Sequence, residues 1–245
     1  MLQKTDNQLK NKYVLVTGAN KGTGFEIAKN FLLEGAIVGV HHYKDESGAR
    51  KLFEYAKPGQ CEIFEADFSK SKEVLSLWKE FISWSKGKID VLVNNAAAIG
   101  QTNEDWDMVF QVNAKAPFLL SRLAFDAMSV QKQGRIINIS SLSVKLGGSL
   151  DVLRYSASKA ALEAITKSFA REGSRFNILV NAVRPGVTDS PIHKKLAQSD
   201  PSFKISAIPL NRFALPKEIA DAVIFLAGSK SSFVTNTIIE VSGGQ

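Results

Sequence analysis

Tyr155 and Lys159 stand four positions apart in a segment with helical spacing, YSASKAALEAITKSFAREG. Residues at this spacing share one face of a helix, so the two side chains can act as a pair. A free phenol has a pKa of about 10, and a cation about 4 Å away supplies about 4 kcal/mol, which is enough to move that pKa toward 7. The spacing alone is weak evidence, but it indicates a tyrosine that can give and take a proton.

A glycine-rich turn, TGANKGTG, lies between an apolar stretch and an amphipathic one. Gly18, Gly22 and Gly24 are spaced differently from the GxGxxG dinucleotide fingerprint, but the physics is the same. Glycines let the backbone approach a pyrophosphate, and the free N–H groups and positive dipole end of the following helix favour an anion. Its place between strand and helix favours nucleotide binding over an ordinary turn.

Strand-like and helix-like segments alternate along the chain, which is typical of parallel βαβ units. Seven strands are expected, and their nearly continuous apolar runs indicate burial on both faces. The sequence therefore predicts an α/β fold, a single Rossmann-type domain over 1–245 with a doubly wound, parallel seven-stranded sheet and helices on both faces. Residues 1–10 are expected to be a polar extension. The expected strands lie in KYVLVT, AIVGVHH, CEIFEAD, IDVLVNNA, GRIINISS, FNILVNAVRP and TNTIIEVSGG.

Two helices and two loops of this pattern bear on the site. Helices are expected over Asp45–Ala56 and Glu104–Gln131. Leu142–Arg154 is rich in Gly and Ser, and Val187–Leu215 carries three prolines, so neither predicts a regular element. Both follow the carboxyl ends of strands, where ligands of open α/β sheets bind. We expect them at the substrate entrance, with 187–215 as the substrate loop; plain surface loops are the alternative.

Composition excludes several classes of protein. The 31 basic and 24 acidic residues give a net charge of +7, but the basic residues are scattered rather than grouped in the stripe of a nucleic-acid binder. The apolar runs are too short to span a bilayer, and the polar N-terminal residues lack the apolar core of a secretory signal, so we expect a cytoplasmic protein. The single cysteine, Cys61, is expected to be buried, and His41, His42 and His193 lack metal-site spacing, so we expect no metal.

Taken together, the motifs resemble those of the short-chain dehydrogenase/reductase family, in its 3-oxoacyl-carrier-protein reductase and sugar dehydrogenase branch. The resemblance extends from Lys10 to Gly244. It is carried, in order, by TGANKGTG, Asp67 in EADF, NNAA from Asn94, Asn113 in VFQVNA, Ser140 and Ser141 in INISS, the Tyr155 to Lys159 pair and RPGVTDS from Arg184.

The resemblance implies a catalytic tetrad of Asn113, Ser141, Tyr155 and Lys159. Ser141 is the better candidate of the two serines and would bind the substrate carbonyl, while Tyr155 would protonate its oxygen as hydride arrives from the nicotinamide. Lys159 would lower the pKa of the tyrosine and hold the ribose, and Asn113 would anchor a water that relays protons.

The resemblance also implies the cofactor contacts. Asp67 would contact adenine, and Pro185 to Val187 with Ser190 would hold the carboxamide. Ala97 replaces the family's usual glycine, Ser190 replaces a common threonine, and the gap from Ser141 to Tyr155 is one residue longer than usual. The full set of expected cofactor contacts consists of Tyr155 and Lys159 together with Gly18, Asn20, Lys21, Gly22, Thr23, Gly24, His42, Tyr43, Lys44, Asp67, Phe68, Asn95, Ala96, Ala97, Pro185, Gly186, Val187 and Ser190.

The residues after the second strand favour NADP over NAD. An NAD enzyme needs an acid near the end of this strand to bind the ribose 2′-hydroxyl. Here the stretch reads HHYK, with His42 at the expected acidic position. Lys21 and Lys44 lie where they can meet a 2′-phosphate.

These features predict an NAD(P)-dependent oxidoreductase that transfers hydride between nicotinamide and a carbonyl or alcohol substrate, with reduction by NADPH favoured. The composition of the loops does not identify the substrate: a tailoring reductase for a sugar or secondary metabolite fits equally well. A catalytically inactive nucleotide-sensing regulator of the same fold is the alternative from another class. A homo-oligomer, tetramer or dimer, is expected through the helices at 104–131 and 155–173, where Ala160, Ala161, Ala164 and Phe169 suit close packing.

Overall fold

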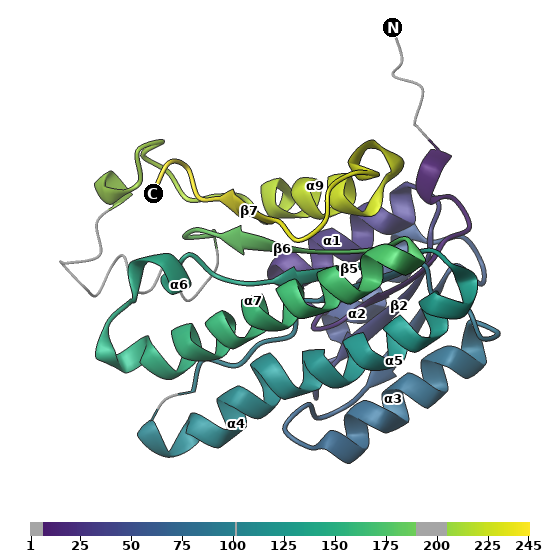
Figure 1. Ribbon diagram of the computed structural model, residues 1–245, viewed down its shortest axis with the longest axis horizontal. Coiled ribbons are helices and arrows are strands. Elements are labelled where there is room, and N and C mark those ends of the chain that lie inside the picture. The colour runs from purple at the N-terminus through teal and green to yellow at the C-terminus, as the bar shows by residue number, and fades with distance from the viewer. Residues whose placement is uncertain (1–6, 101, 190–204) are drawn as a thin grey trace, which may run out of the picture.

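Seven strands form one parallel sheet in the computed structural model, which describes residues 7–100, 102–189 and 205–245 (Figure 1). Their order is β3-β2-β1-β4-β5-β6-β7, and each neighbouring pair is parallel. This sheet confirms the predicted fold. The strands are β1 (Tyr13–Val16), β2 (Ile37–His42), β3 (Cys61–Glu65), β4 (Val91–Asn94), β5 (Gly134–Ile139), β6 (Ile178–Pro185) and β7 (Ile238–Val241).

The strand order reverses at β1. This strand pairs with β2 on one side, Val14 opposite Val38, and with β4 on the other, Val14 opposite Val91. Because the chain winds outward in both directions from this point, the loops after β1 and β4 diverge and leave a crevice at their carboxyl ends. The glycine-rich turn follows β1 and therefore lies at this crevice.

Helices cover both faces of the sheet, as Figure 1 shows. Residues of α1, α2 and α9 pack in one apolar cluster, and residues of α3, α5 and α7 pack in the other. Figure 1 shows α3, α5 and α7 side by side in the lower half of the view, and α9 at the top next to α1. The helices are α1 (Gly22–Leu33), α2 (Ser47–Lys51), α3 (Ser71–Trp84), α4 (Trp106–Phe110), α5 (Ala116–Gln131), α6 (Ser143–Leu146), α7 (Leu153–Gly173) and α9 (Pro216–Ala227).

Each apolar cluster centres on buried aromatic side chains. Phe31 of α1 is fully buried in the first cluster with residues of α9, and Phe81 of α3 is fully buried in the second. The Phe81 ring lies 6.1 Å from Phe64 and 6.0 Å from Trp84, centroid to centroid. These contacts fix the sheet between two helical layers, so the carboxyl ends of the strands form a rigid edge.

The predicted helix at Asp45–Ala56 is wrong in extent. The α-helix covers only Ser47–Lys51, and a 3₁₀ turn follows at Leu52–Tyr55. The Asp45 carboxylate accepts a hydrogen bond from the Ser47 N–H, which holds the residues before the helix in a turn. Gly48 packs so closely on the Asn20 carbonyl that a Cβ there would lie 1.7 Å from its oxygen.

The two unassigned stretches contain short elements. Leu142–Arg154 holds α6, a 3₁₀ turn at Leu150–Val152 and the start of α7. Within Val187–Leu215, residues 190–204 lie outside the described residues, and the remainder includes a parallel bridge between Thr188 and Ala214. Whether these segments meet the substrate remains a prediction.

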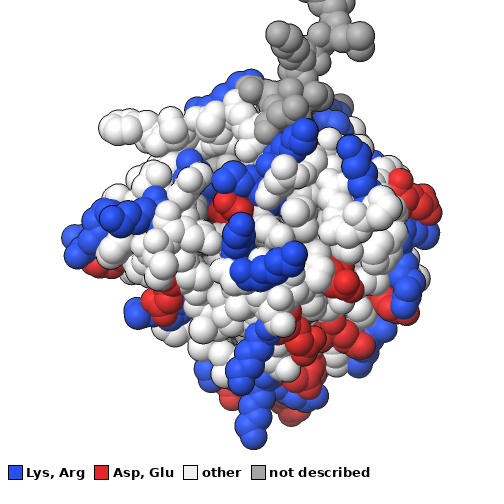
Figure 2. All heavy atoms as spheres, turned by 90° about the vertical axis from the view of Figure 1, so that its right-hand side faces the viewer, with Lys and Arg blue, Asp and Glu red and all other residues white. Residues whose placement is uncertain are grey.

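The surface of the described residues carries both charges. Figure 2 shows one face, on which basic and acidic side chains are interspersed with uncharged ones. In the described part of the chain, no helix is long and apolar enough to cross a membrane. Cys61 is buried in β3 as predicted, and burial raises the pKa of its thiol to about 12.

Candidate active site

Tyr155, Lys159 and Ser141 meet at the carboxyl end of β5. Tyr155 and Lys159 lie on the first turns of α7, and Ser141 is the second residue after β5. The Ser141 side chain lies close enough to Tyr155 to lower the pKa of its hydroxyl. The Lys159 ammonium donates to the Ile139 carbonyl at 2.7 Å, and its nitrogen lies 5.7 Å from the centroid of the Tyr155 ring. The structure thus brings together three of the four predicted catalytic side chains.

The electrostatics of this pair differ from those the spacing suggests. Burial raises the pKa of the Tyr155 hydroxyl, and the hydrogen bond with Ser141 opposes this only in part. Burial also lowers the pKa of Lys159 from 10.5 to about 7. A buried amine that loses its charge near neutral pH cannot stabilise a phenolate strongly. Burial therefore favours the protonated form of Tyr155, which is the form that can donate a proton to a carbonyl oxygen.

Ser141 and Ser140 have different surroundings. The Ser140 hydroxyl is buried and donates to the Glu163 carboxylate at 2.6 Å, and Glu163 also binds Arg184 at 2.8 Å. The Ser141 oxygen instead accepts hydrogen bonds from Ser143, from its hydroxyl at 3.0 Å and its N–H at 3.2 Å. Because its oxygen is supplied with donors, the Ser141 proton is left to point toward Tyr155 and the site.

Asn113 lies inside a π-helical turn, Gln111–Lys115, between α4 and α5. Its side chain is fully buried and donates to the Ala98 carbonyl at 2.7 Å and to the Ser158 hydroxyl at 2.9 Å. Its oxygen accepts from the Ala98 N–H at 2.8 Å. The side chain therefore fixes the segment after β4 against α7. The proton-relay role expected of Asn113 stays a prediction.

A cavity of about 520 Å³ opens at the crevice beside β1. This volume is within the range of small-molecule and cofactor sites. Eleven of the predicted cofactor residues line it: Gly18, Asn20, Lys21, Thr23, Gly24, Tyr43, Asp67, Phe68, Asn95, Ala96 and Ala97. Six lining residues were not predicted, namely His41, Ala66, Ser69, Ala98, Met108 and Val112.

The three glycines of the turn differ in the space around them. Gly18 has φ +63, and a Cβ there would lie 2.8 Å from the Ala96 Cα. A Cβ on Gly24 would lie 2.2 Å from the Gly18 carbonyl oxygen, so neither position accepts a side chain. Gly22 has φ +56, and no atom lies within 4 Å of where its Cβ would be. The space above Gly22, at the start of α1, fits the approach of a dinucleotide pyrophosphate.

Thr17 and Asn95 tie the ends of β1 and β4 together. The Thr17 hydroxyl oxygen, Oγ1, accepts hydrogen bonds from the backbone N–H groups of Asn95 at 2.9 Å and Ala96 at 3.0 Å. The Asn95 side chain donates to the carbonyls of Thr17 and Gly18. These bonds hold the cavity floor fixed, and Thr17 is a residue that sequence reasoning missed.

Other predicted cofactor residues lie outside the cavity lining. His42 is buried and does not line the cavity, and its Nδ1 has no hydrogen-bond partner among the described residues. Lys44 extends over the Tyr43 ring, 4.9 Å from its centroid. Asp67, which does line the cavity, uses its carboxylate to accept from the Ser69 hydroxyl at 2.7 Å. An adenine contact by Asp67 would use its remaining acceptor capacity.

The residues at the end of β6 form a separate wall near Ser141. The Pro185 carbonyl accepts from the Leu142 N–H at 2.9 Å, and the Gly186 N–H donates to the Val241 carbonyl at 2.9 Å. The Val187 carbonyl accepts from the Ala214 N–H at 3.0 Å. These bonds place the end of β6 beside the residue that follows Ser141, while the predicted contact Ser190 lies outside the described residues.

Comparisons with known proteins show what the chain is similar to. The family model described as Enoyl-(Acyl carrier protein) reductase matches residues 18–245. The chain is 34% identical to the 3-oxoacyl-[acyl-carrier-protein] reductase FabG of Thermotoga maritima, over 97% of this chain and 98% of that protein. It is also 34% identical to an acetoacetyl-CoA reductase of an Acinetobacter species, over 95% of this chain and 97% of the relative. A solved short chain dehydrogenase/reductase family protein superposes with a TM-score of 0.85 at 31% identity, covering 97% of this chain and 98% of the other.

Proposed function

Because the chain belongs to the short-chain dehydrogenase/reductase family, we propose that it uses NADPH to reduce the 3-oxo group of an acyl thioester. The family assignment makes it an NAD(P)-dependent oxidoreductase of carbonyl compounds. The proposed substrate class goes beyond the family assignment and is supported by the names of relatives, which give 3-oxoacyl-carrier-protein and acetoacetyl-CoA as substrates. A cytoplasmic location stays a prediction.

The observation that carries the proposal is the meeting of three side chains at the carboxyl end of β5: Ser141 lies close enough to Tyr155 to lower the pKa of its hydroxyl, and the Lys159 nitrogen lies 5.7 Å from the centroid of the Tyr155 ring. Two hydroxyls at one point can both donate to a carbonyl oxygen, where negative charge develops during reduction. Ser143 supplies donors to the Ser141 oxygen, which leaves the Ser141 proton for this task.

The cofactor, when bound, supplies the hydride. Gly22 and the first N–H groups of α1 would receive its pyrophosphate, and the cavity beside β1 would hold its adenine end. Lys159, held by the Ile139 carbonyl, lies under the Tyr155 ring and would hold the ribose next to it. Tyr155, kept protonated by burial, would give its proton to the substrate oxygen.

Two other functions fit the chain less well. A regulator without catalysis would not need Ser141, Tyr155 and Lys159 in contact distance, and this geometry favours an enzyme. A sugar or secondary-metabolite reductase uses the same chemistry with another substrate. The names of the relatives favour a thioester.

A substrate panel tests the proposed function. NADPH oxidation is followed by absorbance with acetoacetyl-CoA, with the simple ester ethyl acetoacetate and with reducing sugars. We expect the highest kcat/KM for acetoacetyl-CoA. A sugar that is turned over faster than both 3-oxo compounds would contradict the substrate class, and no turnover of any carbonyl by a protein that binds NADPH would favour the regulator.

The preference for NADPH rests on the residues beside the adenine end of the cavity. β2 ends at His42 without an acid, and Lys21 lines the cavity. The nearest acid in sequence, Asp45, is exposed and has its carboxylate bonded to the Ser47 N–H. An ammonium at the cavity wall suits the 2′-phosphate that distinguishes NADPH from NADH.

Lys21→Gln is expected to raise the KM for NADPH about 10-fold and to leave the KM for NADH within about 2-fold of its wild-type value. Only NADPH carries the 2′-phosphate, so only NADPH loses a charge-assisted hydrogen bond in this variant. Initial rates with each cofactor at saturating substrate measure this. Lys29→Gln is the control, since Lys29 lies within α1, the helix that follows Lys21, and is paired with Glu26. Equal changes for both cofactors would refute the role of Lys21.

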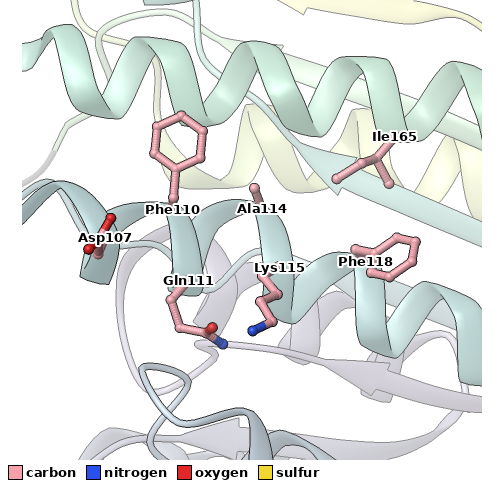
Figure 3. Close-up of a pocket in the computed structure, with 7 residues that line it drawn as sticks. All are labelled: Asp107, Phe110, Gln111, Ala114, Lys115, Phe118 and Ile165. Atoms are coloured by element: carbon pink, nitrogen blue, oxygen red, sulfur yellow. The ribbon is translucent and has the colours of Figure 1, made fainter.

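We also propose a homo-oligomer that forms through α4, α5 and α7. A shallow groove of about 440 Å³ runs between these helices and is lined by Asp107, Phe110, Gln111, Ala114, Lys115, Phe118 and Ile165. Figure 3 shows Phe110 and Ile165 projecting into the space between the helices, while Gln111 and Lys115 point away. Phe118 is 44% exposed, and its ring lies 6.2 Å from Phe169. Such an apolar strip suits the same strip on a second copy.

Phe118→Glu is expected to shift the protein from a multiple of 26.8 kDa to smaller species in light scattering at micromolar concentration, because a carboxylate would be buried in the interface. Val130→Glu is the matched control, since Val130 is on the same helix and 87% exposed. A wild-type protein of monomeric mass would refute the proposal.

A further inference from the structure

His41 is a buried side chain whose two ring nitrogens are both engaged. It is 2% exposed. Its Nδ1 lies 3.0 Å from the Gly18 backbone nitrogen and accepts from that N–H. Its Nε2 lies 3.0 Å from the Ala66 carbonyl oxygen. Because a carbonyl can only accept, Nε2 carries the ring proton and Nδ1 is unprotonated.

The ring also stacks on an aromatic side chain of the cavity wall. The centroids of His41 and Phe68 are 3.9 Å apart, and the planes are within 6° of parallel. Phe68, Ala66 and His41 all line the cavity beside β1. His41 therefore joins the glycine-rich turn to the segment that follows β3, on the other side of the cavity.

The backbone of His41 adds a further link. Its carbonyl accepts from the Ala19 N–H at 2.9 Å, so His41 engages two successive N–H groups of the turn, those of Gly18 and Ala19. Both are withdrawn from any bound anion. The N–H groups of Gly22, Thr23 and Gly24, in the first turn of α1, have no partner within the helix and remain for a pyrophosphate.

We propose that His41 is a positioning residue of the cofactor site, which in its neutral form with the proton on Nε2 holds the glycine-rich turn in the shape that receives the dinucleotide. It acts through Gly18 and Phe68 and needs no contact with the cofactor. The proposal rests on nicotinamide cofactor binding by this cavity.

The charges around the ring are consistent with a neutral histidine. Burial, opposed by the bond to the Ala66 carbonyl and helped by the neighbouring His42, lowers the pKa of His41 to about 4. The ionisable groups that share the cavity are Lys21 and Tyr43 from the loops after β1 and β2, and Asp67 from the loop after β3. Protonation would place two donors, Nδ1–H and the Gly18 N–H, against each other at 3.0 Å. The turn should therefore keep its shape to about pH 5 and lose it in stronger acid.

Three variants separate the contacts of the ring. His41→Phe keeps the stacking on Phe68 and removes both nitrogens. His41→Asn places an oxygen near the position of Nδ1 and can accept from the Gly18 N–H. His41→Gln places an amide near Nε2 and can donate to the Ala66 carbonyl. NADPH dissociation constants are measured by fluorescence titration without a carbonyl substrate, and folding is checked by circular dichroism and thermal melting.

For His41→Phe we expect the dissociation constant to rise about 10-fold, because the Gly18 N–H loses its acceptor. The kcat at saturating NADPH should stay within about 3-fold of the wild type, since Tyr155 and Ser141 are untouched. His41→Asn should recover most of the affinity, and His41→Gln should recover less. Equal losses in the Phe and Asn variants, or a folded Phe variant with wild-type affinity, would overturn the proposal.

The wild-type protein supplies a second measurement in case the variants do not fold. Nitrogen-15 NMR of the histidine ring should show an unprotonated Nδ1 and a protonated Nε2 from pH 8 to about pH 5. A ring that is protonated on Nδ1 at pH 7 would overturn the proposal even if NADPH binds. If neither NADPH nor NADH binds the wild type, the cofactor assignment fails, and the proposal fails with it.

Discussion

Replacing Tyr155 with phenylalanine is expected to lower kcat for carbonyl reduction at least about 100-fold, because a positioned general acid contributes 10²- to 10⁴-fold. The substitution removes one oxygen and keeps the ring that packs beside Lys159. Steady-state rates with acetoacetyl-CoA and NADPH measure the loss. The NADPH dissociation constant should change by less than about 3-fold, since the ring and Lys159 remain.

Tyr55→Phe is the matched control for this experiment. Tyr55 lies after α2 and is partly exposed, with its ring against Phe25. Its variant should keep wild-type kcat. If Tyr155→Phe also retained a kcat near that of the wild type, Tyr155 would be no more than a structural residue of α7, and the mechanism proposed for this site would be wrong.

Lys159→Met is expected to lower kcat by a similar factor and, unlike Tyr155→Phe, to weaken NADPH binding about 10-fold or more, because the amine is expected to hold the ribose. Fluorescence titration and steady-state kinetics together distinguish the two variants. Lys167→Met, an exposed position farther along α7, serves as the control. Unchanged NADPH affinity in Lys159→Met would contradict the ribose contact.

The same variant should alter how stability depends on pH in the cofactor-free protein. Lys159 has a pKa of about 7 when folded and 10.5 as its ordinary value. Between these values the unfolded chain holds a proton that the folded chain has released, so raising the pH favours the folded chain by up to about 1.4 kcal/mol per pH unit. Urea unfolding at pH 7.5 and pH 9.5 should show this gain in the wild type and a smaller one in Lys159→Met. Equal slopes would show that the amine is charged when folded.

The sequence predicted the sheet well because parallel strands that are buried on both faces have nearly continuous apolar runs. In β1, for example, Val14, Leu15 and Val16 are all fully buried. The helix after β2 was less predictable. Its start is set locally by the Asp45 carboxylate, which accepts from the Ser47 N–H. Its placement depends on Asn20, 25 or more positions away in the chain, whose side chain donates to the Asp45 carbonyl and whose own carbonyl packs on Gly48.

The sequence predicted that Ser141, Tyr155 and Lys159 would lie together, but it did not predict the energetics of their surroundings. The pairing of Tyr155 with Ser141 spans two elements that only the fold brings together, and the pKa values of Tyr155 and Lys159 follow from burial, which spacing alone does not reveal. Of the two adjacent histidines, His42 was expected to contact the cofactor because of its position at the end of the strand. The alternation of side chains along β2 instead turns His41 toward Phe68 and the cavity.

The packing of α1 against α9 has a consequence for synthesis of the chain. Phe31 and Ile27 of the first helix share one apolar cluster with Ile219 and Val223 of the last, and Figure 1 shows the two helices side by side. The part of α1 that α9 covers in the folded protein therefore stays uncovered on the ribosome until Pro216–Ala227 has emerged. This layer is completed only after all the strands and helices between α1 and α9 have been made, and a nascent-chain chaperone has its opportunity to bind α1 during that interval.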